Sequence, residues 1–313
     1  SCADAQSGVV SATVTQTLAS EGTNQSATGT CANRAGLSAS DTQTGINIDK
    51  TAPTITFLSR LPAANGNGWN SADVTITWSC TNSLSPILSG TVTQTLTAEG
   101  AAQSATGMCQ DQAGNTASKT QSGINIDKTA PTGVSLVPSG TLGNNGWYTS
   151  NVTITTTGTE AVSGPLTCTG VQSLTTDTAS ATFNGSCTNL AGFTSNAAPL
   201  TLKRDATNPT ITFLNRTPAN GNGWNNGDVT LNWSCTDAMS GPVDGTITQT
   251  ATAEGANQSS TATCFDNAGN SASDTQSGIN IDKTAPGIVA NRTPAANANG
   301  WNNSDVTVTF TGN

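Results

Sequence analysis

Eight cysteines are the residues of this sequence best suited to covalent chemistry, and they fall into four pairs. The two members of a pair are 29 residues apart in three pairs and 19 residues apart in one. A zinc site would need two more ligands for each pair, and the sequence has no histidine. We therefore predict one disulfide per pair and an oxidising compartment, with free or zinc-binding thiols as the alternative. The pairs are Cys2 with Cys31, Cys80 with Cys109, Cys168 with Cys187, and Cys235 with Cys264.

The other residue types do not indicate catalysis. Without histidine, neither a Ser/His/Asp nor a Cys/His set is available, and the four glutamates form no close pairs in the sequence. A net charge of −9 with only ten Lys and Arg disfavours binding to nucleic acid. No apolar run approaches the roughly 20 residues that span a bilayer. We expect no enzymatic activity, no nucleic-acid partner and no membrane span in this segment.

Sequons of the Asn-x-Ser/Thr type make eight asparagines candidates for glycosylation. They are Asn24, Asn151, Asn184, Asn215, Asn232, Asn257, Asn291 and Asn302. A chain so rich in Ser and Thr yields several sequons by chance, so the alternative is that these residues carry no glycan.

Four tryptophans, each at the end of a loop rich in Asn and Gly, are candidates for binding or for packing. They are Trp69, Trp147, Trp224 and Trp301. An exposed indole ring could stack on a sugar. The alternative, which we favour, is that each ring covers the end of its own core or packs on a neighbouring domain.

These residues recur because the chain is built from sequence repeats. The Asn-Gly-Trp motif returns after 78, 77 and 77 residues, and a fixed period of this length indicates repeated domains. We number the predicted repeats 1 to 5 along the chain. They are the partial repeat 1–49, which lacks the first strands, the complete repeats 50–127, 128–205 and 206–282, and the partial repeat 283–313, which has the first strands only.

Period-2 patterning predicts strands that position the cysteines. In residues 74–80, Val, Ile, Trp and Cys alternate with Thr and Ser, so that Cys80 points into the core. A bridge from Cys80 to Cys109 would join two sheets. In repeat 3, Gly158 stands at the position of Cys80 and Cys168 follows ten residues later, so its bridge should join other strands. The fold class predicted is all-β, as tandem immunoglobulin-like β-sandwich domains with one disulfide per repeat.

Several motifs resemble those of one group of bacterial proteins. Ile-Asp-Lys-Thr-Ala-Pro, Asn-Gly-Trp-Asn, Asp-Val-Thr-Ile-Thr-Trp and Asp-Asn-Ala-Gly-Asn are similar to the Ig-like tandem repeats of large surface, adhesin-type or filament-forming proteins. The resemblance covers nearly the whole chain. It implies an extracellular or cell-surface location and domains that serve as stalks, spacers, filament bodies and sometimes binding modules.

The resemblance also implies calcium at the linkers between repeats. The candidate ligands are Asp49, Asp127, Asp205 and Asp282. Ca²⁺ takes about six to eight oxygen ligands, and turn residues such as Asp111 and Asn115, or Asp266 and Asn270, could supply some of them. The alternative, which we favour, is that these residues only form turns. No cofactor is required under either interpretation.

Two functions compete. In the first, the chain is a structural component of an extracellular filament, stalk or surface fibre, because the short linkers contain Pro, which fixes φ and limits swivelling. In the second, it is an adhesin segment that binds glycans or a surface partner. The partial repeats further predict that residues 284–313 pack on a copy of residues 1–49. That copy would belong either to the continuation of a longer chain or to a second molecule joined head to tail by strand donation.

Overall fold

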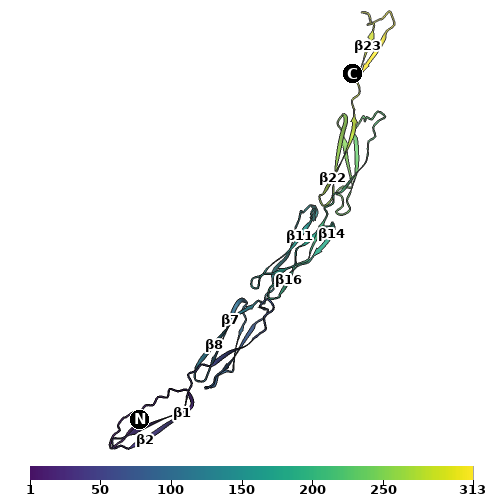
Figure 1. Cartoon of the computed structure of the whole chain (residues 1–313). Coiled ribbons are helices and arrows are strands. Elements are labelled where there is room, and N and C mark those ends of the chain that lie inside the picture. Colours follow the sequence, from purple (N-terminus) through teal and green to yellow (C-terminus); the bar gives the residue numbers. More distant parts are fainter. Residues whose placement is uncertain (313) are drawn as a thin grey trace. The chain divides into compact units, whose positions relative to one another are not determined.

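Almost every regular element of this protein is a β-strand. The computed structural model describes residues 1–312, and the only helical turn among them is η1 (Asn144–Gly146). Figure 1 shows strands along the chain and no layer of helices. Threonine, whose β-branched side chain favours extended backbone, fills many of the outward positions. The all-β class predicted from the sequence is confirmed.

The contacts between residues divide the chain into two compact units. Unit 1 comprises residues 1–135, 156–169 and 185–198, and unit 2 comprises residues 136–155, residues 170–184 and the chain from Pro199 onward. Two strands, β9 (Thr132–Ser139) and β11 (Val152–Thr159), belong partly to each unit. The repeat boundaries drawn from the sequence stay a prediction.

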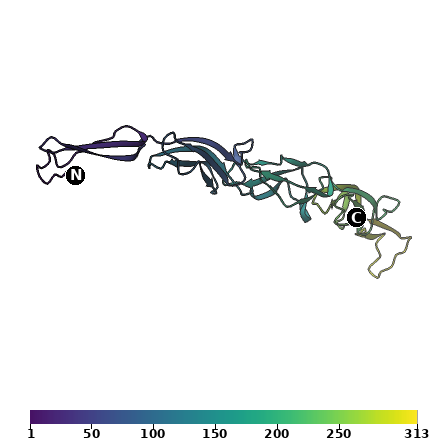
Figure 2. The same ribbon diagram turned by 90° about the horizontal axis from the view of Figure 1, so that it is seen from below.

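Unit 1 holds the strands of the N-terminal part of the chain. They are β1 (Gly22–Ala32), β2 (Ser38–Ile48), β3 (Thr54–Leu61), β4 (Trp69–Asn70), β5 (Val74–Thr81), β6 (Thr91–Leu96), β7 (Gly100–Gln110), β8 (Thr116–Ile126), β12 (Thr167–Cys168), β15 (Ser186–Thr188) and β16 (Thr194–Asn196). The sheets have the orders β1-β2, β3-β5-β6, β4-β8-β7 and β12-β15-β16. Figure 2 shows the β1–β2 ladder in dark purple.

The core of unit 1 lies between the sheets β3-β5-β6 and β4-β8-β7. Alternate residues of β5 are buried, so that Val74, Ile76 and Trp78 face inward. They meet Ile124 and Ile126 of β8, all with no exposed surface. The alternation predicted for residues 74–80 is therefore what builds this core.

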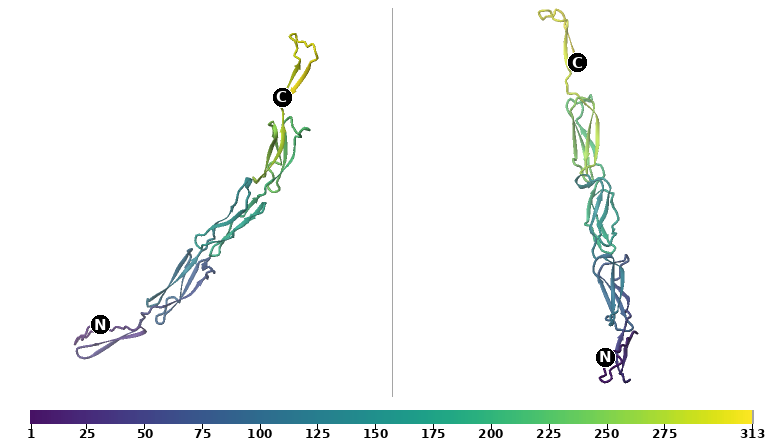
Figure 3. Two further views of the ribbon diagram at one scale, coloured as in Figure 1. Left: turned by 45° about the horizontal axis from the view of Figure 1, so that its top comes forward. Right: turned by 90° about the vertical axis from the view of Figure 1, so that its left-hand side faces the viewer.

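Unit 2 holds the remaining strands. They are β10 (Trp147–Tyr148), β13 (Gln172–Leu174), β14 (Thr178–Phe183), β17 (Leu200–Arg204), β18 (Thr210–Arg216), β19 (Val229–Thr236), β20 (Thr246–Ala251), β21 (Gly255–Phe265), β22 (Ser271–Ile281), β23 (Ile288–Thr293) and β24 (Thr307–Gly312). The sheets within this unit have the orders β10-β17-β14, β18-β19-β20, β21-β22 and β23-β24. Both views of Figure 3 show the β23–β24 hairpin in yellow.

Unit 2 contains two hydrophobic cores. The larger lies between β18-β19-β20 and β21-β22, with Trp233 and Leu231 of β19 packed with Ile279 and Ile281 of β22. The smaller core is formed by Val152, Ile154, Leu174 and Leu202. Both cores are small, as expected for a chain with few aromatic residues, and small cores of this kind usually depend on a covalent staple.

Four disulfides supply such staples, and all eight cysteines are paired. The Cys80–Cys109 bridge joins β5 to β7, which lie in different sheets. Cys168 and Cys187 instead face each other on the neighbouring strands β12 and β15 of one sheet. A Cβ built on Gly158 would lie 3.2 Å from the Cys187 Sγ. In repeat 3, the first cysteine is therefore shifted by ten residues, and a glycine stands at the position that this cysteine occupies in repeats 1, 2 and 4.

Candidate functional site at the repeat junctions

Each of the three linkers that lead into a complete repeat places an aspartate in a small polar socket of that repeat. In unit 1, the Asp49 Oδ2 accepts hydrogen bonds from the Asn82 Nδ2 and the Ser85 backbone N, both at 2.9 Å. The same Asn82 amide donates to the Asp111 Oδ2 at 3.0 Å. One neutral amide therefore lies between two carboxylates. Hydrogen bonds from the Ser85 side chain and backbone, opposed by partial burial, lower the pKa of Asp49 from 3.8 to about 2.

The next socket of unit 1 is built in the same way, except that the amide follows the second cysteine of the repeat and the acid follows the first cysteine position. The fully buried Asp127 accepts from the Ser163 hydroxyl and, at 3.0 Å, from the Asn189 Nδ2. That amide also donates to the Glu160 Oε2 at 2.9 Å. Burial raises the pKa of Glu160, but hydrogen bonds from the Val162 N–H and from Asn189 outweigh it, so the pKa lies below 4.5. Here too, an amide separates two carboxylates.

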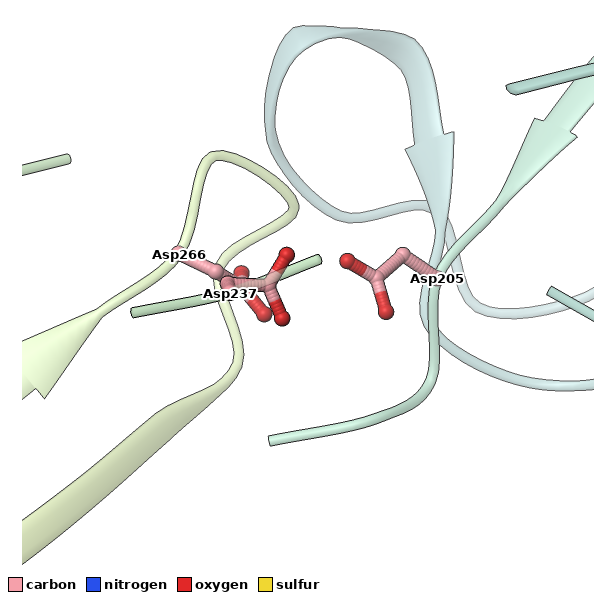
Figure 4. A group of neighbouring side chains, drawn as sticks. All are labelled: Asp205, Asp237 and Asp266. Carbon is pink, nitrogen blue, oxygen red and sulfur yellow. The ribbon is translucent and has the colours of Figure 1, made fainter. Parts of the chain in front are cut away.

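The socket of unit 2 is different because it contains three carboxylates. Figure 4 shows Asp237 and Asp266 side by side, with the Asp205 carboxylate directed at them from the other side. One oxygen atom from each residue lies within 4.8 Å of the other two, and both Asp205 and Asp266 have no exposed surface. Like charges this close repel each other strongly where solvent is excluded. A divalent cation would offset this repulsion.

The three sockets occupy equivalent positions in the repeats. Besides the linker aspartate, each socket has two polar side chains that we call its walls. The first wall residue follows the first cysteine position by two residues and is Asn82, Glu160 or Asp237. The second wall residue follows the second cysteine by two residues and is Asp111, Asn189 or Asp266. Only the last combination is acidic throughout, and carboxylate oxygens are the ligands that Ca²⁺ prefers. Asp205, Asp237 and Asp266 therefore fit a calcium ion better than the other two sockets do.

The four aspartates predicted as calcium ligands thus have different surroundings. Asp49 and Asp127 face an amide, whereas Asp205 lies in the acidic cluster. Asp282 is exposed, and its Oδ1 accepts from the Thr284 backbone N at 3.0 Å. Sequence reasoning named Asp266 but missed Asp237, although its position two residues after Cys235 matches the spacing between Cys264 and Asp266.

A second carboxylate holds each linker from the preceding repeat. The Glu99 Oε1 accepts from the Lys128 backbone N at 2.7 Å and from the Thr129 hydroxyl at 2.8 Å. Glu21 and Glu254 make the same pair of contacts, and Asp177 does so in repeat 3. Sequence reasoning gave these acids no role. Their constant distance of 29 residues from the linker residue was a signal that could have found them.

The Asn/Gly loop that ends in tryptophan also contacts the next repeat. In unit 1, the Asn65 Nδ2 donates to the Leu190 carbonyl at 2.8 Å. In unit 2, the Asn144 backbone N donates to the Ala268 carbonyl at 2.8 Å, and the Asn145 Nδ2 donates to the Asn267 carbonyl at 3.0 Å. Each acceptor lies in the turn that carries a wall residue of the socket. The loop therefore binds the same turn as the linker aspartate.

The tryptophans of these loops differ in exposure. Trp69 and Trp147 are buried, with 7% and 8% of their surface exposed, whereas Trp224 and Trp301 are 37% and 75% exposed. The Lys203 ammonium lies 5.0 Å from the centre of the Trp147 ring. Trp69 and Trp147 therefore pack against protein and do not offer a free ring face for a sugar.

The sequon asparagines lie at or near the surface. Asn24, Asn151, Asn184, Asn215, Asn257 and Asn291 are exposed, and Asn232 and Asn302 are half-buried. The Asn151 Oδ1 accepts from Arg204, and the Asn232 Nδ2 donates to the Asn215 Oδ1. A glycan is attached to the amide nitrogen, so on Asn232 it would compete with the bond that Nδ2 donates, whereas the Asn151 Oδ1 would keep its capacity to accept from Arg204. Glycosylation itself stays a prediction.

Comparison with known proteins gives little beyond this. No protein-family model and no curated protein matches the chain. A structural study of host cell surface retention of a 1.5-MDa bacterial ice-binding adhesin contains a similar chain, all of which aligns with 75% of this one at 12% identity and a TM-score of 0.31. A likeness of this size carries no argument about function. Within the described residues, there is also no helix whose length and apolar character would let it span a bilayer.

Proposed function

We propose that this chain is a structural spacer of an extracellular filament, stalk or surface fibre. Its tandem domains, which we take to be immunoglobulin-like β-sandwiches, are joined by linkers of fixed conformation. The observation that carries this proposal is that the linkers leading into the complete repeats are attached on both sides. Asp127 is held by the repeat that follows it, and Lys128 and Thr129 are held by Glu99 of the repeat before it.

The chemistry of the linker supports a spacer function. A flexible connection leaves backbone N–H groups free to bond with water, whereas here successive linker groups are bonded to protein. Pro131 fixes φ immediately afterwards and is buried. Disulfides in every complete repeat support an oxidising, extracellular location. A spacer needs no catalytic group.

Backbone NMR relaxation of the whole chain tests this proposal. The amides of Lys128 and Thr129 should be as rigid as those of β8, with heteronuclear NOE values of folded backbone. Linker amides that are as mobile as exposed loops would contradict a fixed spacer. Specific binding of the chain to a glycan array would favour the alternative function, an adhesin segment.

We further propose that the socket of Asp205, Asp237 and Asp266 binds calcium. The support for this proposal is the buried acidic cluster, together with the amide that one of the two walls places between carboxylates in each of the other two sockets. The ion would neutralise repulsion and so stabilise the linker of unit 2. No catalytic role follows from it.

A further inference from the structure

We infer that the disulfides hold the walls of the junction sockets in place, so that the cysteines are positioning residues for the linkers. This inference rests on the proposed spacer function, because it concerns how the fixed junctions are built. A disulfide between two sheets is ordinarily regarded as a staple for the core. Here the positions of the socket residues along the chain point to a second, local role.

In repeat 2, the disulfide lies directly before both walls of the socket. Asn82 follows Cys80 by two residues, and Asp111 follows Cys109 by two residues. β5 ends at Thr81 and β7 ends at Gln110, so each wall residue is the first residue beyond a strand. Strand ends fray readily because their last groups lack partners on one side. The bridge between Cys80 and Cys109 ties the two ends together where Asn82 must reach Asp111 and Asp49.

The same arrangement recurs in other repeats. In unit 2, Asp237 and Asp266 follow Cys235 and Cys264 by two residues. In unit 1, Asp4 and Asn33 follow Cys2 and Cys31 by two residues, and the Asn33 Nδ2 donates to the Asp4 Oδ2 at 3.2 Å. Each of these bridges therefore lies two residues before a pair of residues at the positions of the socket walls.

Repeat 3 shows what happens when one cysteine moves. Gly158 replaces the first cysteine, so Glu160 has no disulfide two residues before it. Its Oε1 instead accepts from the backbone N of Ala161 at 2.9 Å and of Val162 at 3.0 Å. Asn189 still follows Cys187 by two residues. In this repeat, the disulfide can position only one wall, and hydrogen bonds from the residues that follow Glu160 hold the other.

The turn that begins with the second wall residue contacts both the linker aspartate and the Asn/Gly loop of the preceding repeat. Asn189 binds Asp127, and the next residue, Leu190, accepts from Asn65 of the preceding repeat. In unit 2, Asp266 lies in the cluster with Asp205, and the adjacent Asn267 and Ala268 accept from the loop of the preceding repeat. Both inter-repeat contacts thus depend on a turn that begins two residues after a disulfide.

Amide hydrogen exchange of the full chain, followed by NMR, tests the inference. In the Cys80→Ala/Cys109→Ala variant, the amide of Ser85, which donates to Asp49, should exchange at least about tenfold faster than in the wild type. The amides of Ile76 and Trp78 in β5 should lose less protection, because the core of Val74, Ile76, Trp78, Ile124 and Ile126 does not contain the bridge.

A matched variant makes the test specific. The Cys168→Ala/Cys187→Ala change removes a bridge that positions one wall only, so the amide of Val162, which donates to Glu160 in the wall that no disulfide precedes, should be affected less than Ser85 is in the first variant. Unchanged exchange at Ser85, or equal loss of protection at Ser85 and at Ile76 and Trp78, would overturn the inference. Rapid exchange at Ser85 in the wild type would instead count against the spacer function itself.

Discussion

The two core tryptophans differ in whether the buried indole N–H has a hydrogen-bond partner. The Trp233 Nε1 donates to the Asp274 Oδ2 at 2.7 Å, whereas the equivalent Trp78 Nε1 is buried without a partner. Lys119 of β8 occupies the position of Asp274, since Lys119 pairs with Gly107 as Asp274 pairs with Ala262. The unpaired N–H of Trp78 therefore goes with two residue differences, Lys119 in place of Asp274 and Gly107 in place of Ala262, and a Cβ at Gly107 would lie 2.6 Å from the Trp78 ring.

Replacing Lys119 should stabilise the protein. Lys119→Asp offers the buried Trp78 N–H an acceptor, and pairing a buried donor contributes about 1 kcal/mol to the free energy of unfolding. Chemical unfolding measured by tryptophan fluorescence checks the change, with Lys119→Ala as the control for loss of the lysine alone. Equal stability of the two variants would show that the carboxylate does not reach the indole.

The acidic socket gives a second test at the level of single residues. Asp237→Asn should give unit 2 the two-carboxylate, one-amide pattern of the Asp49 socket and abolish calcium binding measured by calorimetry. Calcium should raise the unfolding temperature of the wild type but not that of this variant. Asp244→Asn removes an acid outside the cluster and serves as the control. Equal binding by all three proteins would place the ion elsewhere.

At the scale of elements, the sequence predicted what depends on local pattern. The alternation in residues 74–80 gave the buried face of β5, and the shift from Gly158 to Cys168 correctly indicated that this bridge joins other strands than Cys80–Cys109 does. The contacts of Glu99 with Lys128 and of Asn65 with Leu190 could not be derived in this way. They depend on how two repeats meet, and hydrophobic periodicity carries no information about that arrangement.

The stability that the Asp49 linker gives to unit 1 should also depend on pH. Its Asp49 has a pKa of about 2 against 3.8 in its ordinary state. A lowered pKa means that the folded form binds the proton more weakly, so the stabilisation is present above about pH 4 and is lost as the pH falls toward 2. Calorimetric unfolding from pH 6 to pH 2 should show wild type and Asp49→Asn converging at low pH. A difference that stays constant over this range would contradict the assignment.

At the scale of the whole molecule, the recurrence of one junction plan matters more than any single contact. A chain of repeats gains cooperativity when neighbours share an interface, because the stability of the array is then a sum of repeat and interface contributions. In this chain, the interfaces are polar and small, made of an inserted aspartate, a carboxylate that holds the linker and one loop. Small interfaces of this kind should be sensitive to a single methyl group at the closest approach.

Gly143 stands at that closest approach in unit 2. A Cβ added there would lie 2.2 Å from the Ala268 carbonyl oxygen, so Gly143→Ala must push the loop off the turn that carries Asp266. We expect the variant to uncouple repeat 4 from repeat 3, so that one calorimetric transition broadens or splits in two. Gly170→Ala is the matched control, because a Cβ at Gly170 meets nothing within 4 Å. If both variants unfold as the wild type does, the loop contact contributes nothing to the coupling, and the linker alone must join the repeats.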